Sequence, residues 1–190
     1  MARAGLSADR VVEEAAALAG EVGMEALTLA AVAQRVGVRT PSLYKHVEGG
    51  LPQLRRLLGI RAKRRLAAVL AEAAVGRSRG DALRALAEAY RRWASAHPAD
   101  YAAAQRAPLT GDAEDEQASA EVTRVVFGAL AGYDAGEDTL VDAVRSLRAG
   151  LHGFVTLDAA GGFALPRSLD DSFAWWLATL DSALAHAAAS

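Results

Sequence analysis

The spacing of the apolar residues constrains the fold of this chain more than any other feature. Val11, Ala15, Leu18 and Val22 recur every three to four positions, which places their side chains on one face of an α-helix. Similar spacing follows through most of the chain, and no stretch alternates apolar and polar residues for long enough to predict a β-strand. The sequence therefore predicts an all-α protein.

The composition agrees with this prediction and bounds the number of domains. Hydrophobic residues make up 52% of the 190 residues, enough for a sizeable core in one domain or two small ones. Alanine, the best helix former, is abundant, and isoleucine occurs once. We expect a three-helix domain over residues 1–50 and a larger helical domain over residues 51–190, joined through a long helix at about 51–75.

Several function classes are excluded by what the sequence lacks. The chain has no cysteine, which excludes disulfides and thiolate metal sites and fits a reducing compartment. Charges at Asp9 and Arg10 interrupt the start of the chain, so we expect no signal peptide. No uncharged apolar run approaches the roughly 18 residues of a membrane span. We expect a soluble, cytoplasmic protein without a metal or cofactor.

The charge is distributed unevenly along the chain. Residues 1–65 hold 11 Lys/Arg and 6 Asp/Glu, a balance of +5, whereas residues 66–190 balance at −7, which gives the net charge of −2. A basic first third suggests a polyanionic partner for that part alone. The run Arg61-Ala62-Lys63-Arg64-Arg65 has a second interpretation, because such a run can also be a solvated helix face.

Cap and breaker residues predict where the helices begin and end. Ser7 is a good N-cap for a helix at about 8–22, Thr28 can cap a short second helix, and Gly37 is placed to end it. Thr40 followed by Pro41 predicts the N-cap and first position of a third helix that continues to Val47. Further helices are expected at about 51–75, 81–96, 98–106, 115–133, 137–159 and 169–188.

Residues 28–47 carry the main functional signal, because two short helices joined by a glycine-containing turn are typical of a helix-turn-helix. On a helical wheel Leu43 and Val47 point inward, whereas Pro41, Ser42 and Lys45 point outward. Lysine reaches guanine edges or phosphates, and a proline ring can contact a thymine methyl.

The predicted DNA-binding residues are those whose side chains this arrangement presents: Thr28, Arg39, Thr40, Pro41, Ser42, Tyr44, Lys45 and His46. Each has a structural alternative when it is taken alone. The two threonines cap helices with or without DNA, and Tyr44 and His46 can serve packing.

The same stretch resembles a known family. Residues 26–47 are similar to the DNA-binding domain of TetR-family regulators, above all at Val36-Gly37-Val38 and Ser42-Leu43-Tyr44-Lys45-His46-Val47, and the resemblance covers roughly residues 7–60. A second resemblance, through His97-Pro98 with Tyr101 and through Leu151-His152-Gly153, is to one C-terminal subgroup. The resemblance implies an all-helical, dimeric regulator that represses promoters until a small molecule binds.

The sequence departs from the family pattern in two places. Members often have a lysine at the start of the fourth helix that meets a phosphate, where this chain has Gly49-Gly50; bare backbone amides at a helix start can also hold a phosphate. The second helix has Ala30 and Ala31 where a basic residue often faces the groove. Base reading by the second helix is therefore not expected, although Gln34 and Arg35 remain as candidates for backbone contacts.

The remainder of the chain is expected to bind an effector and to dimerise. An apolar pocket with a few polar groups is typical of ligand sites, and its candidate residues are Trp93, His97, Tyr101, Gln105, Phe127, Leu151, His152 and Phe154. The alternative is ordinary core packing. Two apolar stripes on the last two helices suggest a homodimer with a four-helix interface, which would space the two DNA-reading helices for an inverted-repeat operator. The stripes are Leu140, Val144, Leu147, Leu151 and Phe154, and Phe173, Trp176, Leu177, Leu180 and Leu184.

Two other functions compete with that of a DNA-binding regulator. An enzyme is disfavoured, because the four histidines show no metal-ligand spacing and no phosphate-binding or Gly-x-Ser-x-Gly motif is present. A helical ligand-binding or interaction module that no longer reads DNA is the alternative function, since the alanines of the second helix and the diglycine leave it open.

Overall fold

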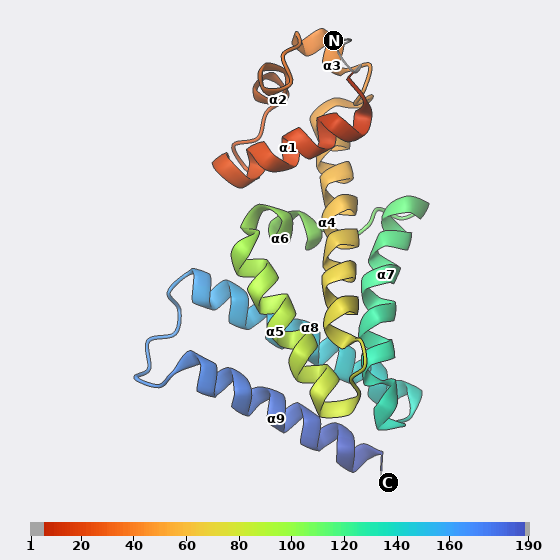
Figure 1. Ribbon diagram of the computed structural model, residues 1–190, viewed down its shortest axis with the longest axis vertical. Helices are drawn as coiled ribbons and strands as arrows, with labels where there is room; N and C mark the ends of the chain where they lie inside the picture. Colours follow the sequence, from red (N-terminus) through yellow and green to blue (C-terminus); the bar gives the residue numbers. More distant parts are fainter. Residues whose placement is uncertain (1–5, 189–190) are drawn as a thin grey trace. The chain divides into compact units, whose positions relative to one another are not determined.

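The computed structural model describes residues 6–188, and every regular element in that range is a helix (Figure 1). The predicted all-α class is therefore confirmed. In chain order the elements are α1 (Ala8–Val22), α2 (Leu29–Arg35), α3 (Thr40–Leu43), α4 (Gly50–Ala74), α5 (Arg79–Ala96), α6 (Pro98–Ala104), α7 (Ala113–Leu130), the 3-10 turn η1 (Ala131–Tyr133), α8 (Glu137–Ala159) and α9 (Leu169–Ala187). Within residues 6–188, no helix is long and apolar enough to cross a membrane, and no group of three or more candidate ligands could hold a metal ion.

The helices form two compact units. Unit 1 comprises residues up to Arg65 together with 97–119, and unit 2 comprises residues 66–96 together with the chain from Ala120 onward. The change of unit lies within α4, fifteen residues beyond the end of the expected first domain at residue 50. The functional division at residues 50 and 51 stays a prediction.

Two predicted N-caps are present as hydrogen bonds, and a third cap begins α9. The hydroxyl of Ser7 accepts from the Arg10 amide at 3.2 Å, and that of Thr28 accepts from the Ala31 amide at 3.2 Å. The hydroxyl of Ser168 accepts from the Asp171 amide at 3.3 Å. Each bond satisfies a backbone donor that the first turn of a helix leaves open, and such a cap contributes about 1 kcal/mol.

The helix-turn-helix part of unit 1 closes around a small apolar core. Val11 of α1 and Val32 of α2 are fully buried, and α1 packs on α2, which packs on α3. Leu43 and Val47 are 0% and 1% exposed. The prediction that these two side chains point inward is confirmed, so the opposite side of α3 is the side that faces solvent.

Unit 2 is built around α5, α8 and α9, each of which packs on the other two. Leu147 and Leu151 of α8 are buried, as are Phe173 and Leu177 of α9. Much of the two apolar stripes that were expected to pair with a second copy is therefore used inside the unit. These helices leave a different face exposed, which includes Ala149 of α8 and Ala178 of α9.

One close approach in unit 2 requires a glycine. A Cβ at Gly80, in the first turn of α5, would overlap the Asp181 carboxylate of α9. That carboxylate accepts a hydrogen bond from the Tyr133 hydroxyl at 2.5 Å. Burial, with the adjacent Asp181 charge, raises the pKa of the Tyr133 phenol, so this tyrosine stays a neutral donor that ties η1 to α9.

Candidate DNA-binding surface and helical body

The exposed side of α3 carries four side chains that can meet DNA. Arg39, Pro41, Ser42 and Lys45 are all exposed, and we call these four residues the reading face. Pro41 and Ser42 lie within α3, Arg39 immediately precedes it, and Lys45 follows in a turn. Because Leu43 anchors the helix from behind, the reading face has a fixed direction.

The start and the end of α3 both differ from the prediction. Thr40 was expected as the N-cap, but Arg39 occupies that position and provides no side-chain cap. The cause is a tight first turn in which the Ser42 amide donates to the Arg39 carbonyl at 2.8 Å. Thr40 is thus a helical residue, half-buried at the edge of the reading face.

The third helix was expected to continue to Val47, but regular α-helix ends at Leu43. The His46 and Val47 amides both donate to the Leu43 carbonyl, at 2.9 and 3.0 Å. The chain therefore continues as a tightened turn, which keeps Lys45 next to Ser42. Helix ends often contain such turns.

Three other predicted DNA-binding residues, Tyr44, His46 and Thr28, lie outside the reading face. Tyr44 is 49% exposed, and its ring borders Gly50, where an added Cβ would come within 3.4 Å of it. His46 is half-buried and Thr28 is exposed. Of these, Thr28 has an established structural role as the cap of α2, and its hydroxyl proton remains available to donate to a phosphate.

The sequence suggested Arg35 of α2 as a DNA backbone contact. In the structure its guanidinium donates to Glu21 at 2.8 Å and to Glu14 at 3.4 Å. The hydrogen bond from Arg35 lowers the pKa of the Glu21 carboxyl. Arg35 thus joins α2 to α1, and its charge is already compensated within the protein.

The α4 basic run, residues 61–65, was open to two interpretations, and the structure differs from both. Arg61 donates to Glu13 at 2.6 and 2.7 Å and also pairs with Asp100 at 3.1 Å. Arg65 pairs with the same Asp100 at 2.7 Å. The run is therefore neither a free polyanion-binding surface nor simply a solvated face, because its charges join α4 to α1 and α6.

A buried ion pair lies at the centre of the α4 basic run. Lys63 Nζ donates to Asp115 Oδ1 at 2.6 Å, and the side chains are 5% and 0% exposed. Arg106 donates to the other oxygen, Asp115 Oδ2, at 2.7 Å. One buried carboxylate at the start of α7 thereby accepts from two cations, which satisfies both of its oxygens.

Two further carboxylates of unit 1 are held in their charged form by arginines. Arg56 donates two hydrogen bonds of 2.5 Å to Asp112, and these lower the pKa of the Asp112 carboxyl to about 2. The hydrogen bonds from Arg61 lower the pKa of the Glu13 carboxyl.

The ion pairs leave few cations for an external partner. Among the Lys and Arg side chains of residues 6–65, only those of Arg10, Arg39 and Lys45 have neither an ion pair nor a hydrogen bond with the described residues, and Arg39 and Lys45 both belong to the reading face. The basic surplus seen in the sequence is therefore available to a polyanion mainly at α3.

The eight predicted effector-binding residues are divided between the units. His97, Tyr101 and Gln105 belong to unit 1, and Trp93, Phe127, Leu151, His152 and Phe154 belong to unit 2. Trp93, Tyr101 and Leu151 are buried, whereas His97 and His152 are exposed. Their common role in binding an effector stays a prediction.

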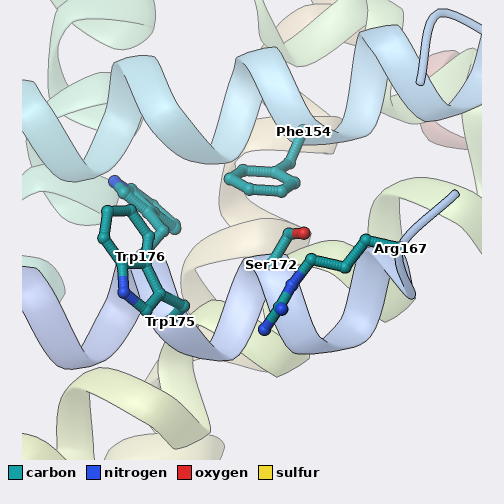
Figure 2. A pocket seen from close by; sticks show the side chains of 5 residues that line it. All are labelled: Phe154, Arg167, Ser172, Trp175 and Trp176. Carbon is teal, nitrogen blue, oxygen red and sulfur yellow. The ribbon is translucent and has the colours of Figure 1, made fainter. Parts of the chain in front are cut away.

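A groove opens between α8 and α9 in unit 2 (Figure 2). It has a volume of about 560 Å³ and is lined by Phe154, Arg167, Ser172, Trp175 and Trp176. Of the eight predicted effector-binding residues, Phe154 belongs to it. We call this the aromatic groove. Arg167 and Ser172 were not among the predicted residues, because nothing in the linear pattern shows that the loop before α9 lies beside Phe154.

Comparison with known proteins agrees with the helix-turn-helix. Residues 11–46 match the family described as bacterial regulatory proteins, tetR family, and residues 83–180 match the tetracyclin repressor-like C-terminal domain. The uncharacterized HTH-type transcriptional regulator YobS of Bacillus subtilis is 33% identical over 96% of this chain and 94% of its own. The uncharacterized HTH-type transcriptional regulator Rv0681 of Mycobacterium tuberculosis is 35% identical over 82% of this chain and 72% of its own.

Solved structures share the whole fold. A protein of unknown function from Rhodococcus sp. RHA1 is 26% identical, with a TM-score of 0.76 over 95% of this chain and 96% of its own. The TetR family protein ActR of Streptomyces coelicolor, in complex with (S)-DNPA, is 19% identical, with a TM-score of 0.67 over 97% of this chain and 100% of its own. The curated relatives, the two domain matches and the exposed reading face together show that this chain belongs to the TetR family and is a DNA-binding transcription regulator.

Proposed function

We propose that the protein is a homodimeric repressor which binds an inverted-repeat operator through α3 and leaves it when a small molecule binds. The observation that carries this proposal is the reading face, where Arg39 and Lys45 have no ion pair or hydrogen bond with the residues that the structure describes, while the neighbouring cations are paired. The anchoring of Leu43 and Val47 supports insertion of α3 into a major groove.

Each side chain of the surface then has a chemical role. Lys45 reaches a guanine edge or a phosphate, and Arg39 reaches a phosphate. Ser42 and Thr40 donate to phosphates or base edges, and the Pro41 ring contacts a thymine methyl. At the rim, Tyr44, His46 and Thr28 meet the DNA backbone.

The dimer is proposed to form through the exposed face of α8 and α9. Small side chains gather there, including the exposed residues Ser146 and Ala149 of α8 and Ala178, Ser182 and Ala185 of α9. Small residues allow two helix pairs to approach closely, which a four-helix interface needs. A two-fold axis at this face would produce two reading faces that act on one inverted repeat.

The effector is proposed to bind in the helical body, where the predicted ligand residues lie. ActR supports a small-molecule ligand, because it has the same fold and was solved in complex with (S)-DNPA. Such a ligand would act by favouring a spacing of the two reading faces that does not fit the operator.

The experiment that tests DNA reading is selection from a random duplex library with the purified protein at near-physiological salt. We expect enrichment of an inverted repeat whose half-sites are about 10 base pairs, or 34–36 Å, apart or a multiple of that distance. Enrichment of a single half-site would contradict the symmetric dimer, and no enrichment by the folded protein would contradict operator recognition.

Light scattering tests the dimer on its own. We expect a dimer at micromolar concentration, and we expect Ala178→Glu to produce a monomer, because it places charges at a close helix contact. Ala71→Glu is the matched control, since Ala71 is also exposed and helical but lies on α4. A wild-type protein that stays monomeric both free and on DNA would exclude the proposed interface.

A further inference from the structure

Lysine is rare in this chain. The 21 basic residues include two lysines, at positions 45 and 63, and the remainder are arginines. The two residue types differ in reactivity, because a lysine amine can act as a nucleophile toward acyl compounds, whereas a guanidinium stays protonated. The chain therefore offers two side-chain amines to an acyl donor, and the fold decides which of them the donor can reach.

Lys63 is buried in the interior of unit 1. Its Nζ atom donates to Asp115 Oδ1 at 2.6 Å, and the two side chains are 5% and 0% exposed. The second oxygen of Asp115 accepts from Arg106 at 2.7 Å. An acyl donor would have to open this packing and break the ion pair before it could meet the nitrogen. The folded protein thus protects Lys63 from acylation.

Lys45 has the opposite surroundings. Its side chain is exposed and has neither an ion pair nor a hydrogen bond with the residues that the structure describes. The backbone beneath it is held in place, because the Lys45 amide donates to the Ser42 carbonyl at 3.4 Å and Leu43 is fully buried. The Lys45 amine is therefore open to a small molecule from solvent while its position on the reading face is kept.

Charge favours the approach of an acyl donor to the same place. Acyl phosphates and coenzyme A thioesters carry phosphate groups and are anions. Arg39 is a second unpaired cation of the reading face, whereas Arg56 and Arg61 of α4 are neutralised by carboxylates. A cationic surface without counter-charges raises the local concentration of anions. The surface that can attract the phosphates of DNA can thus also attract the phosphates of an acyl donor.

We propose that Lys45 is the acylation site of this chain, and that an acyl phosphate or an acyl thioester prevents operator binding by acylating it. The neutral Nζ attacks the acyl carbon, so that a C–N bond forms and the C–O bond of the acyl phosphate, or the C–S bond of the thioester, breaks. The leaving phosphate or thiolate takes the bonding electron pair, and the proton released from Nζ passes to it or to water. The product is a neutral amide, so the reading face loses one of its two cations. The effect on binding rests on the proposed contact of the reading face with DNA, whereas the selectivity for Lys45 does not.

Mass spectrometry of the full-length protein tests the selectivity without DNA. The protein is incubated with acetyl phosphate and, separately, with acetyl-coenzyme A, and the peptides that contain each lysine are quantified over time. We expect Lys45 to be acetylated at least about tenfold faster than Lys63, and the two rates to become similar in urea, because only unfolding exposes Lys63. Reaction with either donor supports the proposal and identifies the source of the acyl group. Similar rates in the folded protein, or no acetylation of Lys45 by either donor, would overturn it.

Two arginine variants, each of which keeps one lysine, test the effect on DNA binding. Their affinity for the selected operator is measured by fluorescence anisotropy before and after treatment with acetyl phosphate. Lys63→Arg keeps Lys45 and a cation opposite Asp115, so treatment should weaken its binding about tenfold or more, as for the wild type, because a cation that contacts DNA contributes about this much. Lys45→Arg has no amine at residue 45, so its affinity should be the same before and after treatment. A loss of affinity in treated Lys45→Arg, or none in Lys63→Arg once Lys45 is acetylated, would overturn the proposal.

Protection by the operator separates this proposal from the proposed function. With operator DNA at about ten times its Kd, only the unbound protein can react, so acetylation of Lys45 should slow about tenfold. A duplex of scrambled sequence at the same concentration is the control and should leave the rate nearly unchanged. An unchanged rate with the operator bound would place Lys45 outside the DNA contact and overturn the effect on binding, while operator recognition itself would stand. Failure of the untreated protein to bind any operator would instead contradict the proposed function, and with it the effect of acylation on binding.

Discussion

Residues 61–65 of α4 and residues 39–45 around α3 are both basic, but their charges have different partners. Arg61, Lys63 and Arg65 pair with carboxylates of α1, α6 and α7. Arg39 and Lys45 have no ion-pair partner among residues 6–188. A count of cations along the sequence treats these stretches as equal, whereas their function depends on whether the fold supplies the counter-charge.

The comparison also shows why the denser cluster is the poorer DNA-binding candidate. Binding to DNA gains free energy from phosphates neutralised by cations that are otherwise solvated. A cation that already has a carboxylate partner would lose it on binding, so its net gain is small. The two unpartnered cations of the reading face, although fewer, carry no such cost.

The largest expected effect is on stability, and it comes from removing the counter-charge of a buried cation. Asp115→Asn leaves the buried Lys63 ammonium without a charged partner, and removing one partner of a buried pair costs about 3–5 kcal/mol. We expect the free energy of unfolding, measured with urea, to fall by this amount. Because the cost comes from an uncompensated charge, adding Lys63→Met should recover much of it. A loss below about 1 kcal/mol would show that water reaches Lys63.

The next largest effect is on DNA affinity. Lys45→Ala is expected to weaken binding of the selected operator by about 1–3 kcal/mol and to reduce the dependence of log K on log salt by about one unit if the contact is to a phosphate. Arg64→Gln is the matched control, because Arg64 is exposed but pairs with Glu114. Fluorescence anisotropy at several salt concentrations measures both. Equal losses for the two variants would remove the distinction between paired and unpaired cations.

The sequence predicted the helices well and the partners poorly. The ranges 8–22 and 137–159 coincide with α1 and α8, because apolar period and caps are local properties. The ion pair of Lys63 with Asp115 joins residues 52 positions apart, and no local pattern indicates it. The third helix was expected to continue to Val47, but no residue type in the sequence indicates that the turn tightens already at Leu43.

The aromatic groove shows the same limit in unit 2. Phe154 was predicted as a ligand residue because it is an aromatic residue of the helical body. Its neighbours in the groove, Arg167 and Ser172, come from the loop before α9 and from α9 itself. Only the pairing of α8 with α9 brings them together. Helical spacing placed Trp176, and not Trp175, on the apolar stripe of α9, but it did not show that the Trp176 ring packs against Gly150 of α8.

Acid should destabilise unit 1 through a carboxylate whose pKa is lowered in the folded protein. The pKa of Asp112 is lowered to about 2 by Arg56, so its stabilising contribution is complete above the ordinary carboxyl range. That contribution is lost as the pH falls from about 4 toward 2. We expect urea midpoints to decrease over this window, and Arg56→Gln to flatten the decrease. An unchanged slope in Arg56→Gln would assign the acid sensitivity to other carboxylates.

The smallest effect is expected where the α4 basic run is most exposed. The side chains of Arg64 and Glu114 are each 45% exposed and lie 3.4 Å apart, and exposed pairs contribute about 0–1 kcal/mol. Arg64→Gln should therefore change the free energy of unfolding by less than about 0.5 kcal/mol. Compared with Asp115→Asn, this variant contrasts Lys63 and Arg64, two cations that are neighbours in sequence. Lys63 is buried, so the loss of its partner is costly, whereas Arg64 is exposed. A loss comparable to that of Asp115→Asn would mean that the ion pairs of α4 act as one cooperative network, with Glu114 joining Arg56 to Arg64.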